Sequence, residues 1–207
     1  MKTAVLISSL LVAFSVTATE ENGAEYRAYN TPVNYNFAKI SVGQTSIDDI
    51  DIDATVIQGG GEGMINENWI YDMYYTGSLI DEDYLTGLSS ALTFGVSYRF
   101  PVAEKLDLVV GGGVAYAWYD LDTYDDNDTD NDFGLSVKSS LRYGFTDKFE
   151  GSIGLAAVNL YDSTATTISG SISFYPTKNF GFGVSVAQTS DDVDTSSIGA
   201  HIKFNFN

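Results

Sequence analysis

The sequence predicts an all-β fold: a transmembrane, antiparallel, up-and-down β-barrel of ten strands. Three observations support this prediction. Apolar and polar residues alternate with a period of two in segment after segment, an export signal precedes these segments, and the connections between them are of two kinds that alternate along the chain. Each strand of such a barrel shows lipid one face and a polar interior the other. An eight-stranded barrel with a rearranged N-terminal hairpin is the alternative, because the first two segments alternate least clearly.

Residues 1–18 have the features of a secretory signal peptide. Lys2 supplies a positive charge, Ala4–Val16 is mostly apolar, and Val16-Thr17-Ala18 offers a cleavage site with small residues. This apolar stretch is shorter than the ~20 residues of a membrane helix, so we expect the exported chain to cross a membrane with strands that close into a barrel. Residues 19–33 are polar and aperiodic, and we expect them to form a periplasmic tail before a barrel domain over residues 34–207.

The alternation is clearest near the middle and the end of the chain. From Leu88 to Phe100 and from Ile198 to Phe206 one face is apolar and the other is small, polar or charged. A soluble sandwich also alternates, but a charged inner face favours a membrane barrel. The predicted strands are Tyr35–Thr45, Asp51–Gly61, Trp69–Ser78, Leu88–Phe100, Leu106–Trp118, Phe133–Phe145, Phe149–Leu160, Thr166–Tyr175, Phe180–Gln188 and Ser196–Phe206.

The connections between these strands alternate between short turns and acidic loops. The short turns, near residues 65–68, 101–105, 146–148 and 175–179, are flanked by aromatic residues, and three of them carry a lysine. The acidic loops lie near residues 48–51, 81–83, 120–132, 162 and 191–194. This alternation predicts tight periplasmic turns at one rim and longer outer loops at the other, with both termini in the periplasm. Tyr75, Tyr116 and Trp118 are candidates for the outer aromatic belt.

Composition excludes several kinds of function. The formal charge of −18 argues against a nucleic-acid partner, because a phosphate backbone is bound by lysine and arginine. The chain has no cysteine, so neither disulfides nor thiolate metal sites are available. We expect no cofactor.

The chain resembles the small outer-membrane β-barrel family of Gram-negative bacteria, the OmpA-like and porin-like barrels without a periplasmic domain. The turn-and-strand units carry this resemblance, together with the terminal pattern of Gly199, Ile202, Phe204 and Phe206, although Asn207 follows the last aromatic residue. The resemblance implies an outer-membrane location, contact with lipid and lipopolysaccharide, and the terminal pattern as a signal to the barrel-assembly machinery. It does not specify an activity.

Strand parity places a set of charged side chains inside the barrel. Arg99 with Asp107, and Arg142 with Glu150, flank two of the short turns, and we expect them to form a charge cluster near that rim. The cluster is interpreted either as a salt-bridged plug or, because many other inward residues are small, as the constriction of a narrow pore. The inward residues of interest are Asp72, Arg99, Asp107, Lys138, Arg142, Glu150, His201 and Lys203.

The acidic run from Asp125 to Asp132 invites a calcium interpretation, because hard cations bind carboxylate oxygens. The candidate ligands are Asp126, Asp128, Asp130 and Asp132. Asn131 replaces the glycine of an EF-hand loop, and Val137 replaces its bidentate glutamate. We therefore predict no true metal site, and favour a solvated acidic loop over weak binding of Ca²⁺ or Mg²⁺.

The sequence gives little support to an enzyme. The single histidine, His201, lies in the last strand, far from the acidic loops, and Ile202-Lys203 follows it in place of a serine. We expect a non-enzymatic protein that is structural or interacts at the surface. A narrow porin-like channel is the alternative, and an outer-membrane enzyme is a remote one.

Overall fold

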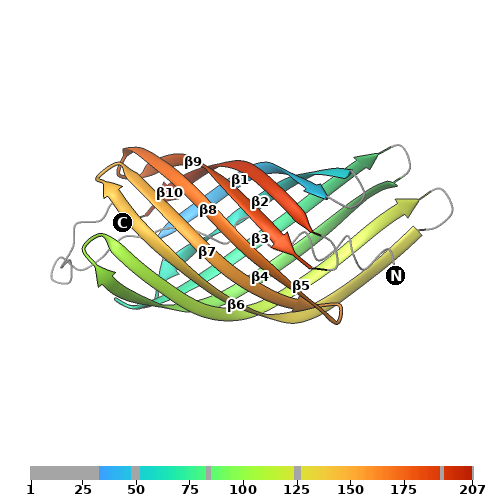
Figure 1. Cartoon of the computed structure of the whole chain (residues 1–207), viewed down its shortest axis with the longest axis horizontal. Coiled ribbons are helices and arrows are strands. Elements are labelled where there is room, and N and C mark those ends of the chain that lie inside the picture. The colour runs from blue at the N-terminus through green and yellow to red at the C-terminus, as the bar shows by residue number, and fades with distance from the viewer. Residues whose placement is uncertain (1–32, 48–51, 83–84, 124–126, 192–193, 207) are drawn as a thin grey trace.

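The computed structural model describes residues 33–47, 52–82, 85–123, 127–191 and 194–206. Ten strands in these ranges form one closed antiparallel barrel (Figure 1), which confirms the ten-strand prediction. The strands are β1 (Phe37–Ile47), β2 (Ile52–Met64), β3 (Trp69–Glu82), β4 (Leu85–Ala103), β5 (Leu106–Thr123), β6 (Asn127–Thr146), β7 (Phe149–Leu160), β8 (Ser163–Thr177), β9 (Phe180–Ser190) and β10 (Thr195–Asn205). In the described ranges, no helix is long and apolar enough to cross a membrane.

Strand order follows chain order, and β1 pairs with β10 to close the barrel. This seam runs from the pair Phe37 and Asn205 to the pair Ile47 and Thr195. The short connections between β2 and β3, β4 and β5, β6 and β7, and β8 and β9 lie at one end, with the start of β1 and the end of β10. We call this end the turn rim. The opposite end, where Asp53, Asp81, Asp122 and Asp194 lie, is called the acidic rim.

The segment predicted as a long acidic loop, residues 120–132, is mostly paired strand, so that prediction is wrong. Tyr119 pairs with Asp130, and Asp122 with Asn127. Backbone pairing does not require apolar side chains, and an antiparallel sheet tolerates water on its faces. The hairpin of β5 and β6 therefore continues where aspartates replace apolar residues on the outer face of β5, while Tyr119 and Leu121 point inward. Asp126 lies outside the described residues.

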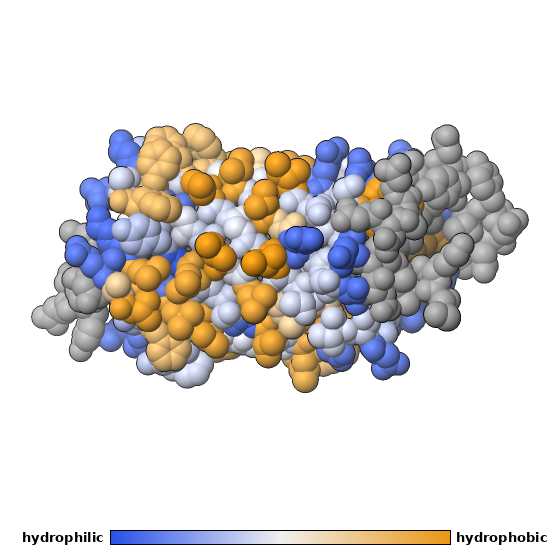
Figure 2. All heavy atoms as spheres, viewed as in Figure 1, coloured by the Kyte–Doolittle hydropathy of each residue, from blue (hydrophilic) through white to orange (hydrophobic). Residues whose placement is uncertain are grey.

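The outer face of the barrel is apolar over most of its height. On β6, Phe133, Leu135 and Val137 are each more than 60% exposed. Figure 2 shows such residues over the middle and the turn-rim part of the barrel, with hydrophilic residues gathering at both ends. Aromatic side chains contact one another near the turn rim, for example Phe180 and Phe204 at 5.6 Å between ring centroids. A surface of this kind matches the hydrocarbon layer and an interface of a membrane.

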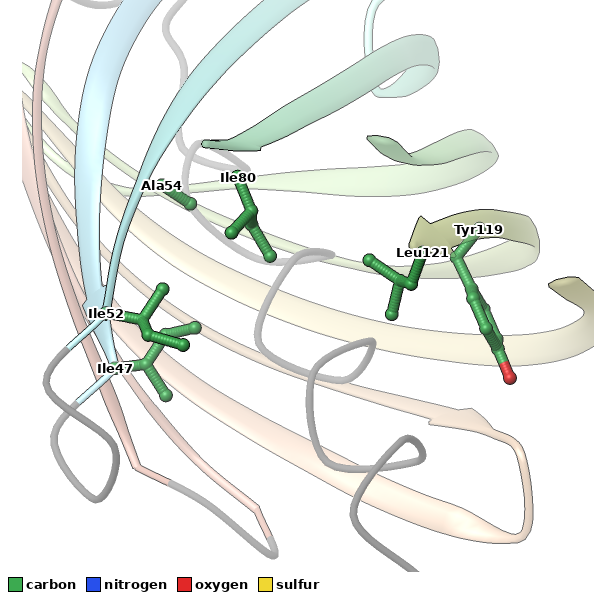
Figure 3. Close-up of a cluster of buried hydrophobic side chains, with 6 residues drawn as sticks. All are labelled: Ile47, Ile52, Ala54, Ile80, Tyr119 and Leu121. Atoms are coloured by element: carbon green, nitrogen blue, oxygen red, sulfur yellow. The ribbon is translucent and has the colours of Figure 1, made fainter. Parts of the chain in front are cut away.

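The interior has two halves of different chemistry. Near the turn rim it is charged, as described below. Near the acidic rim it is lined by apolar side chains, which Figure 3 shows pointing inward from their strands. They form a cluster of Ile47, Ile52, Ala54, Ile80, Tyr119 and Leu121. A neighbouring cluster comprises Ala91, Ala115, Ala117, Val158, Leu160 and Ala165. The sequence did not predict this apolar half.

Tyr161 lies in the two-residue turn between β7 and β8 at the acidic rim. Tyr161 and Asp162 both have positive φ, 51° and 62°, as a tight hairpin turn with right-handed twist requires. Glycine or asparagine is the usual residue at such positions. Other contacts stabilise the tyrosine in this turn. Its hydroxyl donates to the Ala117 carbonyl at 3.1 Å, and its ring packs against both apolar clusters.

Candidate functional site

A cluster of ionised side chains fills the interior near the turn rim. Each of them points inward, on the same face of its strand as small or polar side chains. We call the set the charged cluster. It consists of Lys39, Glu62, Asp72, Arg99, Asp107, Lys138, Arg142, Glu150 and Lys203.

The most enclosed ion pair of the charged cluster joins Arg142 on β6 to Glu62 on β2. The guanidinium donates two hydrogen bonds to the carboxylate, of 3.0 and 2.9 Å, and both side chains are less than 5% exposed. β2 and β6 lie four places apart in a ring of ten strands. This bidentate pair therefore reaches across the interior rather than along the wall.

Two further ion pairs also cross the interior. Lys138 on β6 donates to Asp72 on β3, and Lys203 on β10 lies 3.6 Å from Glu150 on β7. Tyr175 supports the second pair, because its hydroxyl donates to Glu150 at 2.8 Å. In each case the partner strands are three places apart. Together the three pairs connect parts of the wall that are three or four strands apart.

Gly95 makes room for one of these pairs. A Cβ atom at this position would lie 2.8 Å from Asp72 Oδ2 and 3.1 Å from Lys138 Nζ. Both distances are shorter than ordinary van der Waals contact. The glycine on β4 thus allows the carboxylate and the ammonium group to meet over the sheet.

Tyr35, just before β1, covers the charged cluster from within. Its side chain is fully buried, and its hydroxyl donates to Asp107 at 3.1 Å. The guanidinium groups of Arg99 and Arg142 lie 5.2 and 5.1 Å from the centroid of its ring, which is the range of cation–π contact. Arg99 also donates to Asp107 at 2.8 Å. The residue predicted to begin the first strand instead lies within the interior.

Two small cavities lie beside described members of the charged cluster. A cavity of about 10 Å³ lies beside Glu62, Asp72, Lys138 and Arg142, and a second, of about 40 Å³, lies beside Gln58, Asp72, Thr76 and Lys138. A cavity needs roughly 10–15 Å³ to hold one water molecule. The first of these spaces is about the size of one water molecule, and the second is large enough for a few.

The structure places all eight predicted inward residues inside the barrel and joins Arg99 to Asp107. The expected pairing of Arg142 with Glu150 is different: Arg142 binds Glu62, and Glu150 binds Lys203 and Tyr175. Sequence reasoning missed Glu62, because Gly59-Gly60-Gly61 hides the parity of β2. It also missed Lys39 and Tyr35, although Lys39 lies on the same inward face of β1 as Phe37 and Ser41.

His201 does not form a catalytic triad in the described part of the chain. Its Nε2 lies 2.9 Å from the Ser173 hydroxyl, but its Nδ1 has no hydrogen-bond partner among the described residues. A Ser–His pair with hydrolytic activity needs a group that orients the imidazole and a path for substrate. Both side chains are buried in the wall.

Three of the four aspartates considered for calcium, Asp128, Asp130 and Asp132, lie on the inward parity of β6, and Asp126 lies outside the described residues. Asp132 accepts a hydrogen bond from the Tyr161 backbone amide. Within the ranges that the structure describes, no three histidine, cysteine or acidic side chains are grouped so as to hold a metal ion. Of the terminal pattern, Ile202, Phe204 and Phe206 are exposed on the outer face, and Gly199 lies on the inward parity of β10.

Comparisons with known proteins agree on one kind of fold. The family model of the outer membrane protein beta-barrel domain matches residues 6–206. Among solved structures, the NanC porin has a TM-score of 0.52 at 12% identity, over 82% of this chain and 100% of that one. The transport unit of the autotransporter AIDA-I from Escherichia coli has a TM-score of 0.50 at 10% identity, over 99% and 97%. The attachment invasion locus protein Ail of Yersinia pestis has a TM-score of 0.43 at 12% identity, over 82% and 99%. No curated protein matches the chain.

Proposed function

The chain belongs to the outer membrane protein beta-barrel family, and we propose that it acts in the Gram-negative outer membrane as a closed, non-enzymatic barrel whose acidic rim interacts with its surroundings. The observation that carries the proposal is the set of ion pairs across the interior. Arg142 with Glu62, Lys138 with Asp72, and Lys203 with Glu150 connect strands three or four places apart. A solute would have to break these pairs to pass.

The energetic cost of opening such an interior supports closure. Removing one partner of a buried ion pair leaves an uncompensated charge and costs about 3–5 kcal/mol. The bidentate pair of Arg142 and Glu62 has the geometry in which this cost is largest, because two charge-assisted hydrogen bonds are lost together. Tyr35 adds an aromatic cover over both arginines.

The proposal includes an orientation. We infer that the turn rim faces the periplasm, with both ends of the barrel there, and that the acidic rim faces the outside. Short turns and the terminal pattern at Phe204 and Phe206 support this orientation, since barrels of this class have short periplasmic turns. In this orientation, four aspartates on the outer side of their strands lie at the height of the lipopolysaccharide head groups. They are Asp53, Asp81, Asp120 and Asp122.

Carboxylates at the height of the lipopolysaccharide head groups suggest lipopolysaccharide itself as the partner, bridged by divalent cations. Lipopolysaccharide phosphates and protein carboxylates are both anionic, so Mg²⁺ or Ca²⁺ would have to bridge them. Replacing Asp53, Asp81, Asp120 and Asp122 with asparagine is expected to leave assembly intact and to lower the lipopolysaccharide that co-purifies with the barrel in Mg²⁺. Equal co-purification for the variant and the wild type would contradict a surface role for these residues.

The decisive experiment is conductance in a planar bilayer. Protein whose folding is shown by heat-modifiable migration is expected to give no discrete current steps. The double variant Glu62→Ala/Arg142→Ala removes both partners and is expected to give steps, because a cross-lumen connection is lost without leaving an unpaired charge. Its matched control is Asp147→Ala/Lys148→Ala in an exposed turn, which should stay silent.

A narrow channel is the second candidate, and one observation favours it. The side chains of Arg99 and Lys138 are 24% and 22% exposed, in contrast to the enclosed Arg142. They would line any remaining path. Discrete steps from the folded wild type, with ion preference altered by Arg99→Ala, would establish the channel and overturn the closed barrel.

A further inference from the structure

A groove runs along the outer face of the barrel near the turn rim, over β2 and between β1 and β3. Its volume is about 870 Å³, within the range of roughly 300–1,000 Å³ that is usual for ligand sites. Its apolar lining consists of Ala38, Met64, Ile65, Tyr71, Met73 and Phe206. We propose that this groove binds the acyl chain of a zwitterionic phospholipid, and that the ammonium of the lipid head group meets Glu67 at the end of the groove.

The depth of the groove follows from glycines on the outward parity of β2, which are Gly59, Gly61 and Gly63. The register partners of Gly59 are Ile40 on β1 and Tyr75 on β3, so side chains stand on both sides of bare backbone. A Cβ atom at Gly59 would have no other atom within 4 Å, which shows that the space above this position is open. The glycines explain the hollow, and the turn beside it indicates the charge of the ligand.

The turn between β2 and β3 holds a carboxylate at the end of the groove. Asn66 Oδ1 accepts hydrogen bonds from the backbone amides of Asn68 and Trp69, both at 3.0 Å, and these bonds fix the form of the turn. Glu67 lines the groove and is exposed, and it forms no ion pair with another described residue. Its carboxylate is therefore available to a positively charged group from outside the chain.

The four turns at this rim differ in charge. The turn between β2 and β3, residues 65–68, carries Glu67 and no basic residue. Each of the other three turns carries a lysine, and these are Lys105, Lys148 and Lys178. A lysine suits the phosphate that all phospholipid head groups share, whereas a lone carboxylate suits an ammonium group. The groove thus ends at the turn whose charge selects a head group that carries an amine.

The position of the groove favours a phospholipid over two other occupants. In the proposed orientation, on which this choice rests, the turn rim lies in the leaflet opposite the lipopolysaccharide. Lipopolysaccharide phosphates would also be repelled by the Glu67 carboxylate. A second copy of the chain would form a symmetric interface from identical surfaces, so one groove would face another and the hollow would remain unfilled.

The test of the head group is native mass spectrometry of the refolded protein in detergent, titrated with dioleoyl phosphatidylethanolamine or dioleoyl phosphatidylglycerol. The wild type is expected to retain one phosphatidylethanolamine, and to prefer it over phosphatidylglycerol, which has no amine. Glu67→Gln should lower this preference about two- to fivefold, the contribution of one exposed ion pair. Asp147→Asn, which removes a carboxylate from the turn between β6 and β7, should keep it.

The test of the groove uses the same titration with Ala38→Phe, which fills the hollow from the outward side of β1 and should abolish retention of the lipid. Its matched control, Ala157→Phe on the outward side of β7, should retain the lipid as the wild type does. If Ala38→Phe does not fold, Gly59→Leu fills the same hollow at a position with open space around the new side chain.

Four results would overturn the proposal: unchanged retention in the variants that fill the groove, equal retention of the two phospholipids by the wild type, tighter retention of lipopolysaccharide, or a dimer without lipid. Failure of the proposed function is distinguishable from these results. Lipid retention is measured in detergent without reference to an open or closed lumen or to the orientation in a membrane. Current steps from the wild type would therefore overturn the closed barrel and leave the result for the groove unchanged.

Discussion

The two halves of the interior are lined by different kinds of side chain. Near the turn rim, long charged side chains reach across the interior and meet partners three or four strands away. Near the acidic rim, apolar side chains cluster against their neighbours on the wall. Directional pairs fix which strands face one another, whereas apolar contacts are less selective. On the proposed function, the lumen is closed by a few ion pairs, and the apolar half contributes stability without determining whether the lumen is closed.

The largest expected effect is the loss of one partner in the charged half. Arg142→Met removes the guanidinium that donates two hydrogen bonds to the buried carboxylate of Glu62, and we expect a loss of about 3–5 kcal/mol in the free energy of unfolding. Glu62→Gln/Arg142→Met should recover most of that loss, because the carboxylate that lost its guanidinium is neutralised as well. Urea unfolding of the refolded protein measures both. A double variant no more stable than Arg142→Met would contradict the idea that the pair acts as a unit.

A smaller effect is expected in the apolar half. Ile52→Ala removes buried methyl groups from the cluster with Ile47 and Leu121, and we expect a loss of about 2 kcal/mol. Bilayer recordings of the same variant should remain silent, because the ion pairs across the interior are intact. Current steps from Ile52→Ala would show that the apolar half also closes the lumen.

Gly95→Ala tests the space required by one ion pair. Its Cβ would lie 2.8 Å from Asp72 Oδ2, so we expect the pair with Lys138 to shift, at a cost of about 1–2 kcal/mol. In a Lys138→Met/Asp72→Asn background the same glycine change should cost less. Equal costs in the two backgrounds would mean that the backbone, and not the ion pair, requires glycine.

The smallest effect concerns pH at the acidic rim. Burial, followed by the nearby carboxylates of Asp130 and Asp132, raises the pKa of Tyr161 above its usual value near 10. Because the pKa of Tyr161 is higher in the folded state than in the unfolded state, the contribution of its neutral phenol to folding stability is present below pH 10. That contribution is lost as the pH rises toward the folded-state pKa. Tyr161→Phe should therefore lose less stability than the wild type between pH 10 and 12, as thermal unfolding at several pH values would show. Parallel losses would contradict this role.

Much of the barrel follows from local patterns. Period-two alternation predicted the position of each strand, because lipid and interior demand different side chains at successive positions. The hairpin beyond Tyr119 was missed, since the alternation is inverted there: Tyr119 and Leu121 point inward, and the aspartates between them point outward. The partner of Arg142 was also missed, because Glu62 is 80 residues away and meets it only after five strands have curved. Inward apolar residues such as Ile52 and Leu121 were also unexpected, because the cluster in which they are buried forms only when the sheet closes into a barrel.

The seam has a consequence for the order of assembly. Strands β2 to β10 each pair with the strand before them in the chain, so hairpins form between near neighbours. The remaining pairing joins residues 37–47 to residues 195–205, and closing so long a loop carries the largest entropic cost of any contact in the sheet. Before that step the growing sheet has two unpaired edges, at which other strands can add. Completion of the barrel therefore depends on the two strands that the chain brings together last.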